Sequence, residues 1–309
     1  MALKLTWDEG KARSLVLGFH AAYQTHTHLF KNVHAMNGDA PQHKYLPSGV
    51  AKGSPEHVLF LFFATMLTYR SLSEMGFKQA VDLYEKKLHL FSGAAANLSE
   101  KELYAVFKEV GFVHPSQVAK NWPRVAGELF QMYEGNPLTI FTKGVTIDGV
   151  MKLKKGPKGT MLFPGYGPKL FSLLSIFYEE LGVMPHIRGA FPVDLHVQRI
   201  FISSNVVTGA GTMDAAEIAE FIRVRLSELC YELDIKPLDL SHALWFLGNK
   251  LCTKCDKVKG IKSGCPVEEM CSGGIPSLSY NKTGRWELDV PRKEKGHPFH
   301  GSHQVILFS

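Results

Sequence analysis

Two short segments of this chain contain residue types that can act together in chemistry. The first, Phe163–Lys169, reads Phe-Pro-Gly-Tyr-Gly-Pro-Lys and leads into an apolar stretch, which predicts a tight turn followed by a helix. Glycines permit positive backbone dihedrals and let a ligand approach the main chain closely. The first N–H groups of a helix lack intrahelical acceptors and favour an anion, so a nucleic-acid phosphate is the expected ligand. The second segment, Val193–Val197, reads Val-Asp-Leu-His-Val and supplies a carboxylate, Asp194.

Lysines gather around the first segment. No acidic residue occurs between Asp148 and Glu179, and this interval contains Lys152, Lys154, Lys155, Lys158 and Lys169. The whole chain has a formal net charge of +6 and a pI of about 8.9, which favours a polyanionic partner. Because the basic patch coincides with the predicted turn, Lys155 and Lys158 are candidate contacts to a DNA backbone.

Together the two segments resemble the catalytic segments of the helix-hairpin-helix (HhH-GPD) DNA glycosylases, in particular the endonuclease III-like enzymes. In that family a Leu-Pro-Gly-Val-Gly hairpin precedes a catalytic lysine, and a Val-Asp-Thr-His-Val segment contains the catalytic aspartate. Lys169 falls on the lysine of this pattern and Asp194 on the aspartate. The gap between the two residues is several residues longer than in the family, and the extra residues lie around Gly182–Gly189.

The resemblance implies a bifunctional enzyme that excises a damaged or modified base flipped from duplex DNA and then acts as an AP lyase. Positive charge develops on the deoxyribose as the glycosidic bond breaks, and a carboxylate at the position of Asp194 would stabilise that charge. Lys169 would attack C1′ and form a Schiff base, after which the 3′ phosphate is eliminated.

The resemblance also suggests DNA contacts beyond the two catalytic residues. Arg70 lies in a predicted loop, Thr68–Ser71, where it would fill the space left by the flipped base or contact the opposite strand, or would be an ordinary surface arginine. The remaining candidate contacts are in the two catalytic segments: Gly165, Tyr166, Gly167 and His196.

Three alternatives remain open on the residues themselves, one of which is that the C-terminal cysteines make this chain a zinc-dependent interaction module. A Gly-x-Gly-Pro-Lys hairpin also occurs in non-catalytic helix-hairpin-helix DNA-binding proteins, where the lysine only holds a phosphate. A glycosylase-like enzyme acting on a hypermodified base would carry the same motifs, because the base pocket is formed by residues that no motif marks.

Four of the five cysteines fall within twenty residues near the C-terminus: Cys252, Cys255, Cys265 and Cys271. In a chain expected to be intracellular, shared metal ligation explains such a cluster better than disulfides do. The cluster follows a predicted helix, Ser241–Gly248, as the 4Fe-4S loop does in the endonuclease III branch, so a structural 4Fe-4S cluster is predicted. The spacing of the first two cysteines departs from that branch, and a structural zinc would accept it too. The fifth, Cys230, is predicted to be a buried thiol.

Helical periodicity dominates the chain and predicts an all-α protein, with only Leu138–Val150 suggesting a short β-hairpin. The resemblance adds two helical domains with the active-site cleft between them, a helix-hairpin-helix motif and a Cys-rich metal loop near the C-terminus. The expected division is an N-terminal helix and loop packed on the C-terminal domain, a helical domain with the hairpin, a C-terminal helical domain with the cysteine loop, and a tail of unknown role: residues 1–55, 56–185, 186–275 and 276–309.

Several histidines near the N-terminus fit no familiar metal-ligand spacing and are expected to be exposed or structural: His20, His26, His28, His34 and His43. No apolar run is long enough to span a bilayer, and the first ten residues show no signal-type core. A cytoplasmic, nucleoid-associated or nuclear location is therefore expected rather than secretion. The expected partner is double-stranded DNA with a lesion or modified base, bound by a monomer.

Overall fold

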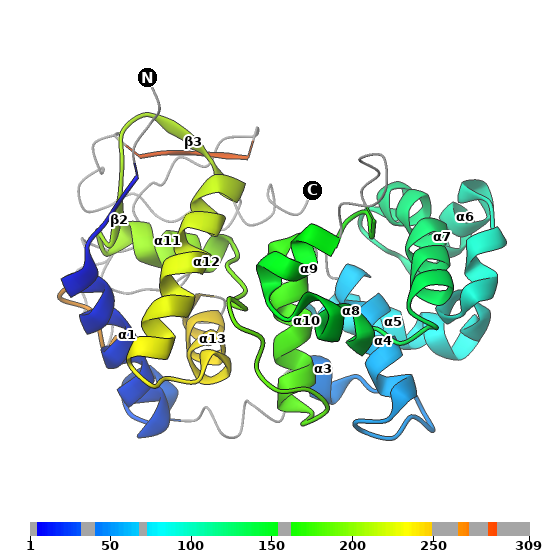
Figure 1. Cartoon of the computed structure of the whole chain (residues 1–309), viewed down its shortest axis with the longest axis horizontal. Helices are drawn as coiled ribbons and strands as arrows, with labels where there is room; N and C mark the ends of the chain where they lie inside the picture. The colour runs from blue at the N-terminus through cyan, green and yellow to red at the C-terminus, as the bar shows by residue number, and fades with distance from the viewer. Residues whose placement is uncertain are drawn as a thin grey trace. The chain divides into compact units, whose positions relative to one another are not determined.

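Figure 1 shows the computed structural model of the chain, which describes residues 5–31, 41–67, 73–153, 162–248, 265–271 and 284–288. Helices predominate in these residues and the strands are short, so the predicted helical class is confirmed. Contacts divide the chain into two compact units. Unit 1 combines Met1–Met36 with Val193–Ile306, and unit 2 combines Asn37–Pro192 with Leu307–Ser309.

Unit 2 is built from helices whose starts follow from local sequence. The Ser54 hydroxyl accepts the His57 N–H at 3.2 Å at the start of α4, and Ser99 forms a capping box with Glu102 at the start of α6; the bounds of both helices are given below. The α-helices of this unit are α3 (Pro41–Lys44), α4 (Pro55–Leu67), α5 (Ser73–Lys86), α6 (Glu100–Val110), α7 (Pro115–Met132), α8 (Leu138–Gly144), α9 (Ile147–Leu153) and α10 (Pro168–Glu180).

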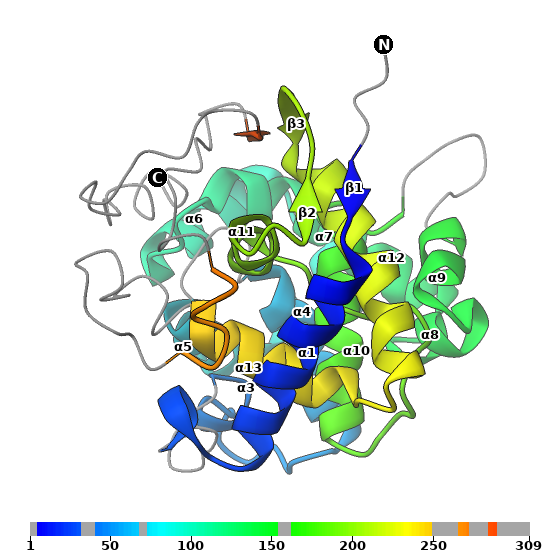
Figure 2. The ribbon, with the colours of Figure 1, turned by 90° about the vertical axis from the view of Figure 1, so that its left-hand side faces the viewer.

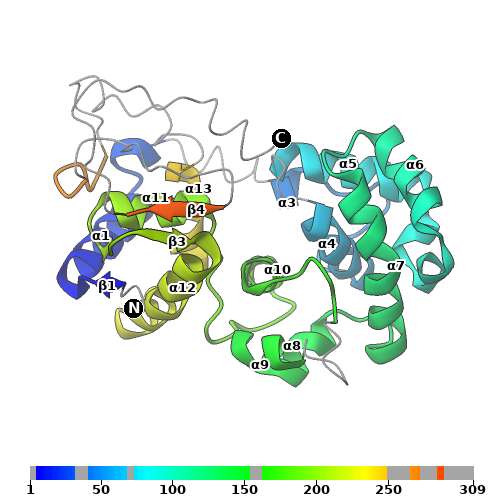
Figure 3. The same cartoon turned by 90° about the horizontal axis from the view of Figure 1, so that it is seen from above.

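The core of unit 2 surrounds α4, which packs against α5 and α10 (Figure 3). Almost every residue of α4 from His57 onward is buried, as its continuous apolar sequence demands. On the α7 side, the Trp122 ring lies 4.7 Å from that of Phe63, and its indole N–H donates to the Leu90 carbonyl at 2.8 Å. These contacts fix α7 against α4 and against the segment at Leu90.

The predicted β-hairpin at Leu138–Val150 is wrong, because this segment forms α8 and α9, which lie side by side. The sharp reversal between them is at Val145, whose φ of 64° lies in the left-handed region. Thr146 then begins α9 by accepting the Gly149 N–H on its hydroxyl at 3.0 Å. The many β-branched and aromatic residues resemble a strand sequence, but the buried ones face the core from two helices: Ile140, Phe141, Ile147 and Val150.

Unit 1 is organised around α1 (Glu9–Gln24), which packs along α13 (Pro237–Phe246), as Figure 2 shows. Asp8 caps α1, and Phe30 bridges from its C-terminal side to Phe246, with ring centroids 5.8 Å apart. The other elements of this unit are α11 (Leu195–Ser203), α12 (Ala215–Glu232), β1 (Thr6–Trp7) paired antiparallel with β2 (Val207–Thr208), and β3 (Thr212–Asp214) paired antiparallel with β4 (Arg285–Glu287).

Two described pieces of the C-terminal region pack on unit 1. Trp286 of β4 is buried and donates its indole N–H to the buried Gln198 amide oxygen of α11 at 2.7 Å. The turn at 265–271 places Val267 against Gly18 of α1, where an added Cβ would lie 3.2 Å from the valine methyl. Cys230 is fully buried as predicted, and burial raises the pKa of its thiol to about 12. None of the helices in the described part of the chain is long and apolar enough to cross a membrane.

Candidate active site

The segment Phe163–Gly167 forms the tight turn that its sequence predicts. The Tyr166 N–H donates to the Phe163 carbonyl at 3.0 Å and closes the turn. Gly165 has a φ of 92°, which an L side chain adopts only at a cost. Gly167 has φ −118° and ψ −176°, an extended conformation open to any residue, so of the two glycines only Gly165 uses the positive dihedral that glycine permits.

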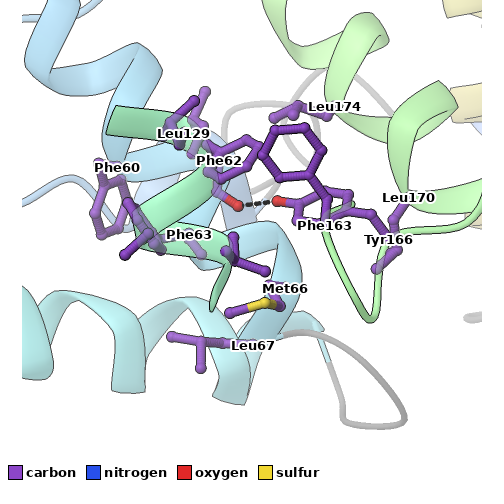
Figure 4. Packing of buried hydrophobic residues seen from close by; sticks show 14 of the residues in the cluster. Phe60, Phe62, Phe63, Met66, Leu67, Leu129, Phe163, Tyr166, Leu170 and Leu174 are labelled. Atoms are coloured by element: carbon purple, nitrogen blue, oxygen red, sulfur yellow. Dashed lines mark hydrogen bonds between the residues drawn. The ribbon is translucent and has the colours of Figure 1, made fainter. Parts of the chain in front are cut away.

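Tyr166 anchors this turn to the core of unit 2. Its side chain is 0% exposed, and its ring stacks on Phe62 of α4 with centroids 4.9 Å apart. Its hydroxyl donates to the Phe62 carbonyl, the bond drawn in Figure 4, and burial raises the pKa of this phenol well above its usual value. A side chain buried in this way does not reach a ligand at the surface. The side chain of Tyr166 therefore fixes the turn, and the DNA contact of this residue stays a prediction for its main chain.

A second tyrosine repeats this attachment. The buried hydroxyl of Tyr178, on α10, donates to the Val58 carbonyl of α4 at 2.9 Å. Val58 and Phe62 are one turn apart on α4, so two phenols hold the turn and α10 to the same row of carbonyls. The helix α10 is thereby held against α4 near both of its ends.

A carboxylate from α7, which the sequence analysis missed, holds the beginning of the turn. Glu128 accepts the Phe163 N–H on one oxygen and the Arg124 guanidinium at 2.7 Å on the other, with 12% of its side chain exposed. Phe163 has a φ of 48°, uncommon for a bulky residue, so the carboxylate stabilises a strained position. Glu128 follows Asn121 by seven residues, so both fall on the same face of α7.

Lys169 is the second residue of α10 and its side chain is exposed. The residue before the helix, Gly167, provides no side-chain cap, and the first turn contains no acidic residue. The N–H groups at this helix start are therefore without a side-chain acceptor in the described chain, and the helix dipole makes the position favourable for an anion. The turn brings Gly165, Gly167 and Lys169 together within one short segment, as predicted.

Asp194 belongs to unit 1 and caps α11. Its Oδ1 accepts the N–H groups of His196 at 2.8 Å and Val197 at 2.9 Å. This pair of bonds fixes the carboxylate at the positive end of the helix. The capping role was not predicted, although an aspartate directly before an apolar helical stretch is its usual signature.

His196 is positioned by the rest of α11. The buried Arg199 guanidinium donates to His196 Nδ1 at 2.7 Å, which puts the ring proton on Nε2, because arginine can only donate. Gly248 approaches so closely that an added Cβ would lie 2.5 Å from His196 Cβ. The imidazole is therefore held in one tautomer and one orientation.

The additional residues between Lys169 and Asp194 form an ordered connection in unit 2. Gly182 and Gly189 take positive φ values of 69° and 81°. Between them the chain pairs with the start of α9, where the Ile147 N–H donates to the Arg188 carbonyl at 3.1 Å. The insertion predicted around Gly182–Gly189 is thus tied to unit 2 by main-chain bonds.

Several predicted residues lie outside the described ranges: Arg70, Lys155, Lys158, His34, Cys252 and Cys255. The other two cysteines, Cys265 and Cys271, lie half-buried at the two ends of one compact turn, in which the Cys271 N–H donates to the Val267 carbonyl at 3.2 Å. Within the described ranges, no three histidine, cysteine or acidic side chains gather as a metal site. The cysteine ligand set therefore stays a prediction.

Comparison with known proteins gives no family model and no curated sequence that matches this chain. The solved structures that are similar to this chain include two 8-oxoguanine DNA glycosylases. The 8-oxoguanine glycosylase/lyase of Methanocaldococcus jannaschii, in complex with DNA containing 8-oxoguanine, is 14% identical with a TM-score of 0.49, over 75% of this chain and 96% of that one. The 8-oxoguanine DNA glycosylase of Thermotoga maritima is 14% identical with a TM-score of 0.47, over 76% and 96%. Similarity at this level assigns no activity to this chain.

Proposed function

We propose that this chain is a DNA glycosylase with AP lyase activity, which excises a damaged or modified base flipped from duplex DNA. One observation carries the proposal: a turn anchored on the core leads into a helix whose start lacks a side-chain cap, and Lys169 stands in the first turn of that helix. Such a start binds a backbone phosphate and sets an amine beside it. A carboxylate fixed as a helix cap, Asp194, supplies the negative charge that the reaction needs.

The proposed reaction begins with base release. As the bond between the base and C1′ breaks, the base takes the bonding electrons and a proton, and the sugar gains positive charge that the Asp194 carboxylate stabilises. The Lys169 amine forms a bond to C1′; one of its protons goes to the departing base and the other to the ring oxygen O4′, whose bond to C1′ breaks as the Schiff base forms. Removal of a proton from C2′ then expels the 3′ phosphate, and hydrolysis of the Schiff base regenerates the amine.

DNA contacts complete the proposal. The main chain at Gly165 and Gly167 would receive a phosphate, and His196 would contact the strand near Asp194. Arg70, Lys155 and Lys158 would contact the backbone or fill the gap left by the flipped base, whose extraction from the stack costs a few kcal/mol. Double-stranded DNA with a lesion or modified base is the proposed partner.

We also propose that four cysteines hold a structural 4Fe-4S cluster, with a structural zinc as the alternative: Cys252, Cys255, Cys265 and Cys271. Thiolates are suitable ligands for both, and Cys265 and Cys271 lie at the ends of one turn that packs on α1. The bound group would tie this turn and the lysine-rich segment before it to unit 1. Iron, sulfide and zinc analysis of protein purified without oxygen, with visible absorbance, distinguishes the two.

Base release and strand scission test the activity. Duplexes with one 8-oxoguanine, one oxidised pyrimidine, one hypermodified base or one abasic site are incubated with the wild type and with Lys169→Ala. We expect release of at least one base and cleavage at the abasic site by the wild type only. Tight binding without release or scission on any duplex would contradict the proposal and identify a non-catalytic DNA-binding protein, whereas release of the hypermodified base alone would identify the specialised enzyme.

A further inference from the structure

The start of α10 is one of two features that point to an unassigned DNA-binding residue. Gly167 gives this 13-residue helix no side-chain cap, and its first turn holds no acidic residue. The N–H groups of Lys169 and Leu170 are too early in the helix to have intrahelical acceptors. Uncapped helix starts are common, however, so this feature does not identify a ligand by itself.

The second feature is Asn121 on the facing side of α7. Its side chain is 91% buried, since only 9% is exposed, and its Nδ2 lies 3.2 Å from where a Cβ would stand on Gly165. In the described part of the chain its amide takes part in no hydrogen bond. The amide is thus directed at the turn without an internal partner.

Folding alone gives no account of this amide. The Asn121 position lies on the face of α7 that also carries Val118, Val125 and Leu129, where an apolar residue would pack well, and the amide makes no hydrogen bond within the described residues. The amide atoms of Asn121 keep some exposure to solvent, whereas the unpartnered Ser172 hydroxyl has almost none. A ligand oxygen at the turn can therefore reach the amide and satisfy it.

We propose that Asn121 is a DNA-binding residue whose Nδ2 donates to the phosphate that occupies the turn at Gly165. This inference rests on the proposed function, since it requires DNA at the start of α10. A phosphate there receives main-chain N–H groups of the turn, the helix dipole and the Asn121 amide together. Gly165 is then needed for two reasons: its positive φ, and the space that it leaves beside the amide.

The test compares DNA affinity with stability in the same variants. Fluorescence anisotropy measures binding to a duplex with one tetrahydrofuran abasic-site analogue, and thermal unfolding is followed without DNA.

Asn121→Ala should bind about tenfold more weakly, because it loses one hydrogen bond to a charged group, while its unfolding midpoint stays the same or rises. Asn121→Asp, nearly identical in shape, should bind more weakly still at low salt, and added salt should narrow its difference from the wild type. Gln131→Ala removes an exposed amide elsewhere on α7 and should match the wild type.

The outcomes separate this inference from the proposed function. A wild type that does not bind the duplex would overturn the proposed function, and the inference with it. A wild type that binds the duplex, together with an Asn121→Ala variant of equal affinity, would overturn the inference alone. Weaker binding with a clearly lower unfolding midpoint would also overturn it, because Asn121 would then act through the fold of the turn.

Discussion

At the scale of single residues, Asp194 has a structural role as a helix cap and a proposed chemical role as a charge. Its Oδ1 accepts two main-chain N–H groups at the start of α11, and its negative charge is the property that glycosidic cleavage requires. Asparagine and aspartate are about equally good helix caps. The structural and chemical roles can therefore be separated by the choice of substitution.

Asp194→Asn should retain the cap and lose the charge. We expect its unfolding free energy to stay close to that of the wild type while base release falls by at least about tenfold. Asp194→Ala should lose both, with about 1 kcal/mol lower stability as well. Denaturant unfolding and single-turnover base release measure the two effects. Wild-type release by the folded Asp194→Asn variant would remove Asp194 from the chemistry.

His57 is a buried imidazole that makes the stability of unit 2 depend on pH. It is 1% exposed, and its Nδ1 accepts the Gly53 N–H at 3.0 Å. Burial, and to a lesser extent the charges of His43 and Lys52, lower its pKa from 6.5 to about 4. The folded protein therefore holds the neutral ring. The stability that this supplies is complete above pH 6.5 and is lost as the pH falls towards 4.

We expect the wild type to lose about 2 kcal/mol of unfolding free energy through His57 between pH 7 and pH 5. His57→Asn keeps an acceptor for the Gly53 N–H and removes the titrating group, so its loss over the same interval should be smaller by that amount. Urea unfolding at the two pH values measures the difference. Equal losses in the two proteins would show that His57 does not carry this pH dependence.

At the scale of elements, the turn before α10 is positioned by its neighbours more than by its own sequence. Tyr166 fixes it to α4, and Glu128 fixes its first residue to α7. Its two glycines differ, since only Gly165 has a positive φ. Alanine substitutions at Gly165 and Gly167 therefore compare the cost of a side chain at a positive φ with its cost at an extended φ within one turn.

Gly165→Ala should lower the unfolding free energy by about 1–2 kcal/mol, because alanine is strained at this φ and its Cβ would press on the Asn121 amide. Gly167→Ala should change the unfolding free energy little, since the backbone is extended there and, among the described residues beyond its chain neighbours, nothing lies within 4 Å of the added Cβ. Chemical denaturation compares both variants with the wild type. Equal destabilisation by the two substitutions would mean that the turn is formed differently.

The sequence predicted those elements of the turn and its surroundings that local chemistry determines. The turn at Gly165 and the helix that follows it were predicted, because both depend on residues a few positions apart in the chain. The burial of Tyr166 could not be predicted, because its partner Phe62 is 104 residues away in the chain. Asn121 and Glu128 were missed for the same reason: only the fold of unit 2 brings α7 to the turn. The catalytic roles of Lys169 and Asp194 stay predictions.

At the scale of the whole molecule, unit 1 is made from both ends of the chain. β1 from the N-terminus pairs with β2, and β4 from the C-terminal region pairs with β3. Nothing local marks these pairings, since each strand has only two or three residues. The C-terminal segment at Trp286 is thereby part of the unit that contains Asp194.

Trp286→Phe should lower the stability of unit 1 by about 1–3 kcal/mol, because it leaves the buried Gln198 amide oxygen without its donor while keeping most of the packing. Gln198→Leu and the variant with both substitutions complete a double-mutant cycle. Gln198→Leu should lower the unfolding free energy less in the Trp286→Phe variant than in the wild type. Thermal unfolding gives the coupling. Strictly additive losses would mean that the bond contributes nothing beyond the two side chains separately.

The central claim is that Lys169 forms a covalent bond to C1′ of DNA. Borohydride trapping on a duplex with one abasic site tests it directly, with wild type and Lys169→Ala compared at equal DNA-bound fractions. We predict a protein–DNA adduct in the wild type whose attachment maps to Lys169 by mass spectrometry, and no adduct in the variant. An adduct of equal yield in Lys169→Ala, or no adduct from a wild type that binds the duplex, would contradict the account.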